Sequence, residues 1–154
     1  MREPDLVREE NAMSDLYEAD ILLWSERQAA LLRRRAAGEL VNDSELDWPN
    51  IVEEIEDVGR SELRSCRSLL RQALRHMLKA EAWPASRDAP TWRADAIDFR
   101  RQARDAFTPS MRQKIDVARL YREALQALPE AVDGKPPLPI NTAAPSLDEL
   151  LSEE

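Results

Sequence analysis

The residues best suited to chemistry in this sequence are its single histidine, His76, and its single cysteine, Cys66. A histidine can bind a metal ion, carry a proton near neutral pH, or bond a carboxylate or carbonyl inside a helical bundle. A di-iron site in such a bundle uses Glu-x-x-His pairs, but Ala73 and Lys79 lie three residues before and after His76. One cysteine cannot form a Cys-rich zinc cluster. We therefore predict no cofactor and no tight transition-metal site made by one chain.

Glu62 is the one charged residue in an otherwise apolar row of a predicted long helix. A buried carboxylate is so costly that it is normally paired, protonated or solvated. Glu62 is therefore expected to pair with Arg27 or Arg122, or else to act as an acid. It precedes His76 by 14 residues, which is about 21 Å along a helix. Glu62 and His76 cannot share a site within one straight helix.

Motifs of nucleophilic catalysis are absent. The sequence has no glycine-rich phosphate loop and no Gly-x-Ser-x-Gly motif. An acid–base or small-molecule site remains an alternative if carboxylates, His76 and Lys79 converge from two helices. Whether the protein is an enzyme stays open. The candidate pocket or partner-binding residues are Asp20, Trp24, Glu54, Glu62, His76, Lys79 and Trp92.

A stripe of arginines lies opposite the apolar row of the same helix. Its members are Arg60, Arg64, Arg67, Arg71 and Arg75. Such a stripe either binds phosphate groups or is a solvated face that pairs with nearby acids. The formal net charge of −8 disfavours nucleic acid and anionic lipid as partners. We predict the solvated face, no nucleic-acid partner and no membrane partner.

The elements that position these residues are predicted to be helices, because glycines are few and helix formers dominate the first 128 positions. A first helix is expected to begin near Ser14 or Asp15 and to end before Gly38. A second is expected to run from an N-cap at Asp47 to Trp83. The inward positions of the first are Met13, Tyr17, Ile21, Trp24, Leu31 and Leu32. Those of the second are Ile51, Ile55, Val58, Glu62, Cys66, Leu69, Ala73, Met77 and Ala80.

Two more helices complete a predicted bundle. The third begins at Asp88-Ala89-Pro90, and the fourth begins at Thr108-Pro109 and ends at Pro129. Their inward positions are Trp92, Ala96, Phe99, Ala103 and Ala106, then Met111, Ile115, Ala118 and Leu125. A proline-rich arm follows, and Ser146-Leu147-Asp148-Glu149 is a capping box that opens a short acidic helix.

The predicted fold is therefore all-α, with four main helices in a bundle, a long second helix, an extended Pro-rich arm and a short C-terminal helix. We divide the chain into an N-terminal tail (1–13), a helical bundle domain (14–129), and the arm with its short acidic helix (130–154). The first ten residues are polar and acidic, without the apolar stretch of a secretory signal. No segment approaches the roughly 20 apolar residues of a membrane span. A cytoplasmic protein is expected.

Several short runs of the sequence belong together: Tyr17-Glu18-Ala19-Asp20 with Trp24, Asp47-Trp48, Glu53-Glu54-Ile55-Glu56-Asp57-Val58-Gly59, Ser61-Glu62, His76-Met77-Leu78-Lys79 and Trp92-Arg93. Over roughly residues 16–128, these runs resemble a bacterial family labelled domain of unknown function 29. The acidic run is the most specific. The resemblance implies a helical protein and no particular activity. The sequence departs from the family pattern after Lys79. Typical members carry a tryptophan at the next position, whereas this chain has Ala80 there and a tryptophan only at Trp83.

The length of the second helix favours an interaction role. A straight helix from Asp47 to Ala82 is about 50 Å long, whereas a compact chain of this size is about 40 Å across. We expect the helix either to bend at Gly59 or to be covered by a second chain. The leading hypothesis is a non-catalytic protein-interaction or self-associating module. The alternatives are an enzyme or metal site on the carboxylate, His76 and Lys79 positions, and an antitoxin-like acidic partner of a basic protein.

Overall fold

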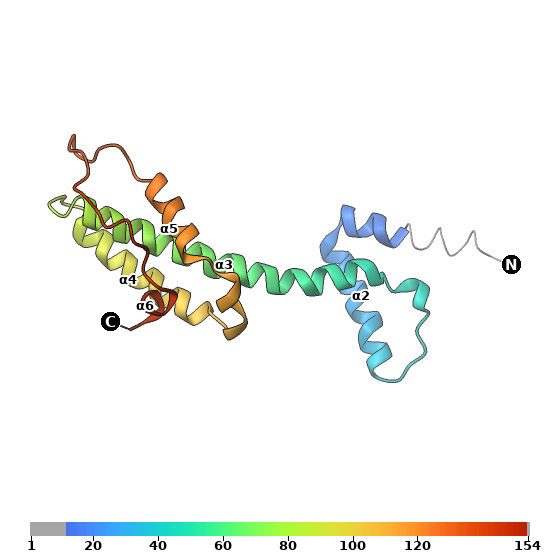
Figure 1. The fold of residues 1–154 in the computed structure, drawn as a ribbon. Helices are drawn as coiled ribbons and strands as arrows, with labels where there is room; N and C mark the ends of the chain where they lie inside the picture. The colour runs from blue at the N-terminus through green and yellow to red at the C-terminus, as the bar shows by residue number, and fades with distance from the viewer. Residues whose placement is uncertain (1–11, 154) are drawn as a thin grey trace. The chain divides into compact units, whose positions relative to one another are not determined.

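In the computed structural model, which describes residues 12–153, the chain is helical, and the predicted all-α class is confirmed (Figure 1). No β-strand occurs within these residues, and Val132 and Lys135 form only an isolated bridge. A helix covers residues 12–19. It is followed by α2 (Ile21–Ala36), η1 (Asp43–Glu45), α3 (Trp48–Ala82), α4 (Ala89–Ala106), η2 (Pro109–Lys114), α5 (Val117–Gln126) and α6 (Leu147–Leu151). None of the helices in the described part is long and apolar enough to cross a membrane.

Two compact units divide the chain between Gly59 and Arg60, within α3. We call the described residues up to Gly59 the N-terminal unit and those from Arg60 onward the C-terminal unit. Each unit has its own cluster of buried apolar side chains. This division differs from the sequence-based one, which placed residues 14–129 in a single bundle.

The first predicted helix is interrupted at Asp20, so the prediction of one continuous helix is wrong. Asp20 leaves the helical conformation, with φ −151° and ψ 84°, and becomes the N-cap of α2. Its carboxylate accepts a hydrogen bond from the backbone N–H of Leu23 at 3.0 Å. An aspartate stabilises a helix start in this way more than it stabilises a helix interior. The break also turns Ile21 outward, where it is 48% exposed rather than inward as predicted.

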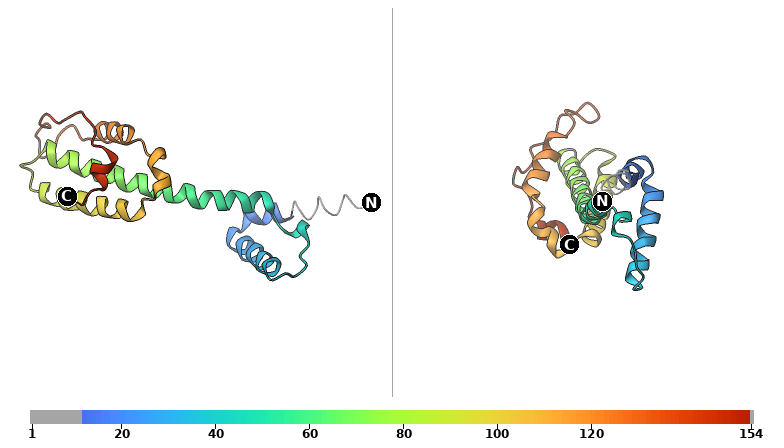
Figure 2. Two further views of the ribbon diagram at one scale, coloured as in Figure 1. Left: turned by 60° about the horizontal axis from the view of Figure 1, so that its bottom comes forward. Right: turned by 90° about the vertical axis from the view of Figure 1, so that its right-hand side faces the viewer.

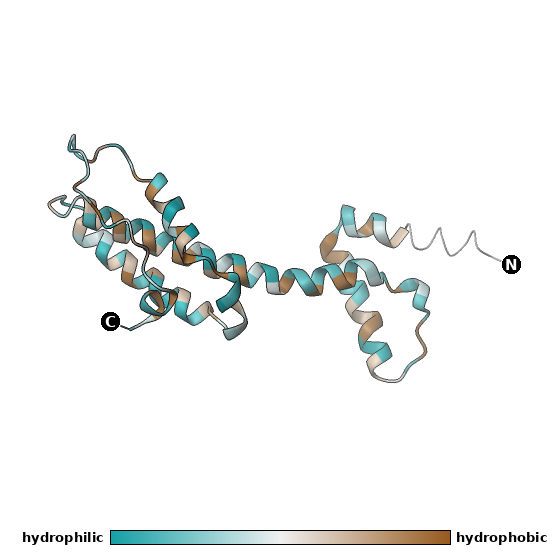
Figure 3. Cartoon of the chain, in the orientation of Figure 1, coloured by the Kyte–Doolittle hydropathy of each residue, from teal (hydrophilic) through white to brown (hydrophobic). Residues whose placement is uncertain are grey.

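The core of the N-terminal unit is small. Its buried apolar residues are Trp24, Leu46 and Ile51. Partly buried side chains packed against them are Leu16, Tyr17, Leu31, Leu32 and Val41. The predicted N-cap at Asp47 agrees with a start of α3 at Trp48, and α3 ends at Ala82, next to the predicted end. Apolar residues recur along the length of α3 (Figure 3).

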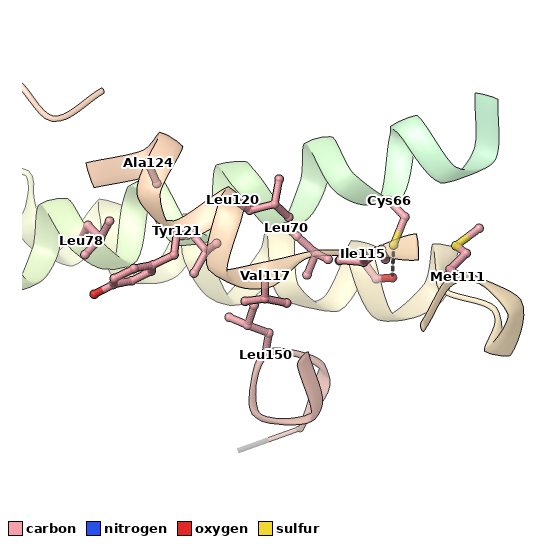
Figure 4. Close-up of a cluster of buried hydrophobic side chains, with 12 residues drawn as sticks. Cys66, Leu70, Leu78, Met111, Ile115, Val117, Leu120, Tyr121, Ala124 and Leu150 are labelled. Carbon is pink, nitrogen blue, oxygen red and sulfur yellow. Dashed lines mark hydrogen bonds between the residues drawn. The ribbon is translucent and has the colours of Figure 1, made fainter. Parts of the chain in front are cut away.

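The C-terminal unit has the larger core, which five elements build together (Figure 4). The second half of α3 lies alongside α4 in both Figure 1 and Figure 2. Leu70, Leu74 and Leu78 of α3 are almost completely buried. They pack in one cluster with Ala103 of α4 and with residues of η2, α5 and α6.

The fourth predicted helix is also wrong as a continuous element, because the chain between Pro109 and Gln126 forms η2 and then α5. Ile115 and Asp116 between them are extended. The Asp116 carboxylate accepts from the backbone N–H of Arg119 at 3.0 Å and so caps a new helix. Ile115 and Met111 are buried as predicted, whereas Ala118 is exposed.

The predicted capping box is confirmed at Ser146, and α6 follows it. Leu150 is 1% exposed and belongs to the main core. The α6 helix contacts α4 (Figure 2). Arg100 donates to the backbone carbonyls of Glu149 and Leu150 at 2.8 and 2.9 Å. The acidic tail helix therefore docks on the arginines of its own chain.

Candidate functional site

Trp24 is the centre of the N-terminal unit. It is 3% exposed, as predicted, and its indole Nε1 donates to Asp47 Oδ2 at 2.9 Å. Tyr17 meets its ring edge to face, with ring centroids 4.9 Å apart. The Asp47 side chain also accepts from Asn50 Nδ2 at 2.8 Å. These contacts tie the start of α3 to α2 and give Trp24 a structural role.

Glu54 is paired with Tyr17. The Tyr17 hydroxyl donates to Glu54 Oε1 at 2.7 Å. This hydrogen bond is the main reason that the pKa of Tyr17 is raised to about 12. The phenol therefore stays protonated at neutral pH and acts as a donor. The hydrogen bond holds the Glu54 carboxylate against Tyr17.

Gln28, which the sequence analysis did not single out, is the buried polar residue of this unit at 2% exposure. Its Nε2 donates to the backbone carbonyl of Glu45 at 3.1 Å, and its Oε1 accepts from the backbone N–H of Asp47 at 2.9 Å. Both ends of the amide are satisfied, so Gln28 holds the turn before α3 in place. Gln28 lies four residues after Trp24 and therefore on the same inward face of the helix. That spacing could have identified it from the sequence as a buried polar residue.

His76 and Lys79 lie together in the C-terminal unit, on one face of α3. They line a hollow of about 360 Å³ with Gln72, Arg75 and the end of α5. The His76 ring stacks on Phe99, with centroids 5.4 Å apart, and its Nδ1 is 3.8 Å from Asp95 Oδ2. The buried Nδ1 has no hydrogen-bond partner among the described residues. Burial lowers the pKa of His76, and Asp95 opposes that shift.

Trp92 contacts Lys79 through its ring face. The Lys79 ammonium lies 5.5 Å from the Trp92 ring centroid, within range of a cation–π interaction. Trp92 is only partly buried, in contrast to Trp24. Two side-chain pairs thus join α3 and α4: Lys79 with Trp92, and His76 with Phe99.

The stability of the protein is expected to fall on acidification from about pH 7.5 to about pH 5.5, because His76 is the only histidine and is disfavoured in its charged form. An unfolded chain takes up the proton near pH 6.5, whereas the folded chain takes it up only at lower pH. Stability is therefore highest above the unfolded pKa and falls as pH drops through the window between the two values. Arg75 and Lys79 on α3 reinforce this effect.

Thermal melts of the wild type and of His76→Gln at the two pH values measure this contribution. The melting temperature of the wild type should drop more than that of the variant. Equal drops would show that carboxylates, and not His76, control stability in this range.

The predicted burial of Glu62 is wrong. Glu62 is exposed, as are its proposed partners Arg27 and Arg122. The row of α3 that contains Glu62 is already exposed at Ile55 and Val58, so water solvates the carboxylate there. A buried acid at this position has no basis in the structure.

The candidate residues fall into different units. Asp20, Trp24 and Glu54 belong to the N-terminal unit, and Glu62, His76, Lys79 and Trp92 belong to the C-terminal unit. The structure brings together Trp24 with Tyr17, and His76 with Lys79, but Asp20 serves as a helix cap. Across residues 12–153, no three side chains of His, Cys, Asp or Glu gather where they could hold a metal ion. The prediction that no cofactor is needed stays a prediction.

Cys66 has no chemical activation. It is fully buried in the core of the C-terminal unit, and its Sγ lies 3.7 Å from the backbone oxygen of Ala103 (Figure 4). Burial raises the pKa of the Cys66 thiol. A reactive cysteine needs a stabilised thiolate, so Cys66 is a packing residue, as the sequence predicted.

The N-terminal unit leaves several large apolar side chains exposed, and three of them form a row on α3. Val52, Ile55 and Val58 are 51%, 68% and 66% exposed. They lie on successive turns of α3, next to the buried Ile51. We call these three residues the α3 apolar row.

Three comparisons place the chain among known proteins. The family model described as domain of unknown function DUF29 matches residues 16–154. The chain is 31% identical to an α-helical protein of unknown function from Rhodospirillum rubrum, whose crystal structure was determined at 1.45 Å. That likeness covers 90% of each chain, with a TM-score of 0.61. A comparison with curated proteins finds no match.

Proposed function

The chain belongs to the family of domain of unknown function DUF29, and from that premise we propose that it is a non-catalytic interaction module that pairs with a second copy of itself. The observation that carries the proposal is the α3 apolar row. Ile51, Ile55 and Val58 recur at intervals of four and three residues, which is the spacing of one helix face. Ile51 is 7% exposed, whereas Ile55 and Val58 are about two-thirds exposed. The apolar face thus continues beyond the core that covers its first member.

Covering the α3 apolar row is favourable. Fully burying a side chain such as valine or isoleucine contributes about 1.5–3 kcal/mol. Exposed apolar residues in a contiguous row are typical of a protein–protein contact. We infer that the row lies in an interface when the protein is in solution.

The charges along α3 favour a second copy as the occupant. Acidic residues precede Gly59 and arginines follow it: Glu53, Glu54, Glu56 and Asp57, then Arg60, Arg64 and Arg67. An antiparallel second α3 would present its basic part to the acidic part of the first, and the contact would be self-complementary. Apart from its chain neighbours and the local backbone of α3, no described atom lies within 4 Å of the position that a Cβ on Gly59 would take. This open position supports close approach of another helix.

The alternatives have less support. An acid–base enzyme needs its carboxylates, His76 and Lys79 in one pocket, but Asp20 caps a helix and Glu54 is bonded to Tyr17. An antitoxin-like role as an acidic partner of a basic protein draws on the net charge of −8. The acidic tail helix is held by Arg100 and Arg112 of the same chain. A cytoplasmic location fits all three functions and stays a prediction.

Replacing Ile55 and Val58 together with glutamine tests the pairing. Glutamine is a good helix former, and both positions are exposed, so the fold of the single chain should persist. We expect sedimentation velocity to show the wild type as a dimer and the double variant as a monomer at the same concentration. Circular dichroism should show equal helix content.

Ile97→Gln provides the matched control. Ile97 is 66% exposed on α4, outside the row. This variant should sediment like the wild type. If all three proteins sediment alike, the α3 apolar row is not the contact between copies.

A further inference from the structure

A charged hollow in the C-terminal unit lies outside the features described so far. It is lined by residues of α3, η2 and α5, and its volume is about 220 Å³. The charged residues in its lining are Arg67, Arg71, Lys114, Asp116, Arg119 and Glu123. The cations outnumber the carboxylates by two, although the whole chain is strongly acidic.

Both carboxylates of the hollow already have partners. Asp116 accepts from the backbone N–H of Arg119 at 3.0 Å as the N-cap of α5. Glu123 accepts from Arg71 Nε at 3.2 Å and from Arg119 Nε at 3.0 Å. The hydrogen bond from Arg119 is the main reason that the pKa of Glu123 is lowered. Glu123 is thus ionised and holds two guanidinium groups from different helices.

The cations keep unused donors. A guanidinium has five N–H donors, and Arg71 and Arg119 each use only Nε for Glu123. Their Nη atoms have no acceptor among residues 12–153. The Lys114 ammonium likewise has none there, while the Lys114 backbone oxygen accepts from Arg67 Nη2. Three elements therefore gather donors that the hydrogen bonds to Asp116 and Glu123 leave unused.

We infer that this hollow binds a small oxyanion of the phosphate class. Guanidinium groups bind phosphate oxygens through paired N–H donors, and the first turn of α5 adds the positive end of a helix dipole. Ligand pockets for larger molecules measure about 300–1,000 Å³, so a hollow of about 220 Å³ suits a phosphate group better. An extended nucleic acid is disfavoured by the net charge of −8.

Titration of the full-length chain with inorganic phosphate, at constant ionic strength, tests the inference. Chemical shifts of the Arg71 and Arg119 Nε–H groups and of the Leu120 amide should change and saturate. Lys114→Ala and Arg119→Gln should each weaken binding at least about tenfold, because each removes charge-assisted donors. Arg119 is 72% exposed, so its replacement leaves the core intact. A parallel titration with glycerol phosphate shows whether a free ion or a phosphate ester binds more tightly.

Arg101→Gln is the charge-matched control, since Arg101 is 64% exposed on α4 and bonds Asp98 instead. It should bind phosphate as the wild type does. Shifts that do not saturate, or that are the same in all four proteins, would overturn the inference. Binding of an oligonucleotide without binding of phosphate would also overturn it. Neither result bears on pairing through the α3 apolar row.

Discussion

Replacing Trp24 with alanine is expected to lower the free energy of unfolding of the N-terminal unit by about 3–5 kcal/mol. Among residues 12–59, Trp24 is one of three buried apolar side chains in that core. The change removes its packing, the edge-to-face contact with Tyr17 and the hydrogen bond to Asp47. The Asp47 carboxylate keeps its hydrogen bond from Asn50 but loses the donor that joins it to α2. Because the whole stability of a domain is about 5–15 kcal/mol, a loss of this size is a large fraction of it.

Native-state hydrogen exchange measures the effect, because it reports on each unit separately. Backbone amides of α2 should lose protection in Trp24→Ala, while those of α4 should keep it. Trp48→Ala is the matched control. Trp48 is 42% exposed, and Arg35 lies over the face of its ring. Its expected cost is about 0.5–1 kcal/mol. Unchanged α2 protection in Trp24→Ala would refute the described core.

Replacing Leu74 with alanine is expected to destabilise the C-terminal unit by about 2–5 kcal/mol. Leu74 is 1% exposed on the α3 face that packs in the main core. Its removal leaves a cavity among side chains from several elements, which cannot all move to fill it. Urea denaturation followed by circular dichroism measures the loss.

Ile97→Ala is the control for Leu74→Ala. Ile97 is about two-thirds exposed on α4 in the same unit, so its truncation should change stability within about 0.5 kcal/mol. A loss in Leu74→Ala no larger than the loss in Ile97→Ala would contradict the assignment of the core.

Helix ends were predictable where a capping residue coincided with a change in the apolar pattern. Asp47 precedes the first residue of α3, and Ser146 forms its predicted capping box. At Ser146 the two reciprocal hydrogen bonds of the capping box fix the helix start locally. The family was also correctly indicated by short runs of residues.

The breaks at Asp20 and Asp116 were missed because apolar periodicity continues through them. Each aspartate has a side chain that can cap a new helix, but each also lies inside a run of helix formers. Which conformation prevails depends on whether the residues beyond the break find a core, as Trp24 and Leu120 do. Sequence patterns alone do not show whether those residues will be buried in a core.

The inward faces were predicted well near each core and poorly between cores. Cys66, Ala73 and Ala80 are buried as predicted, whereas Ile55, Val58 and Glu62 on the same row are exposed. Periodicity identifies an apolar face but not what covers it. The hydrogen bond between Tyr17 and Glu54 depends on how two helices pack against each other. The spacing of residues along either helix does not predict that packing.

The mass of the unmodified chain in solution tests the central claim most directly. One chain has a mass of 17.6 kDa. Light scattering at micromolar concentration should give twice that mass, because a second copy covers the α3 apolar row. A mass of one chain at every concentration measured would contradict self-association and leave Ile55 and Val58 without the proposed partner.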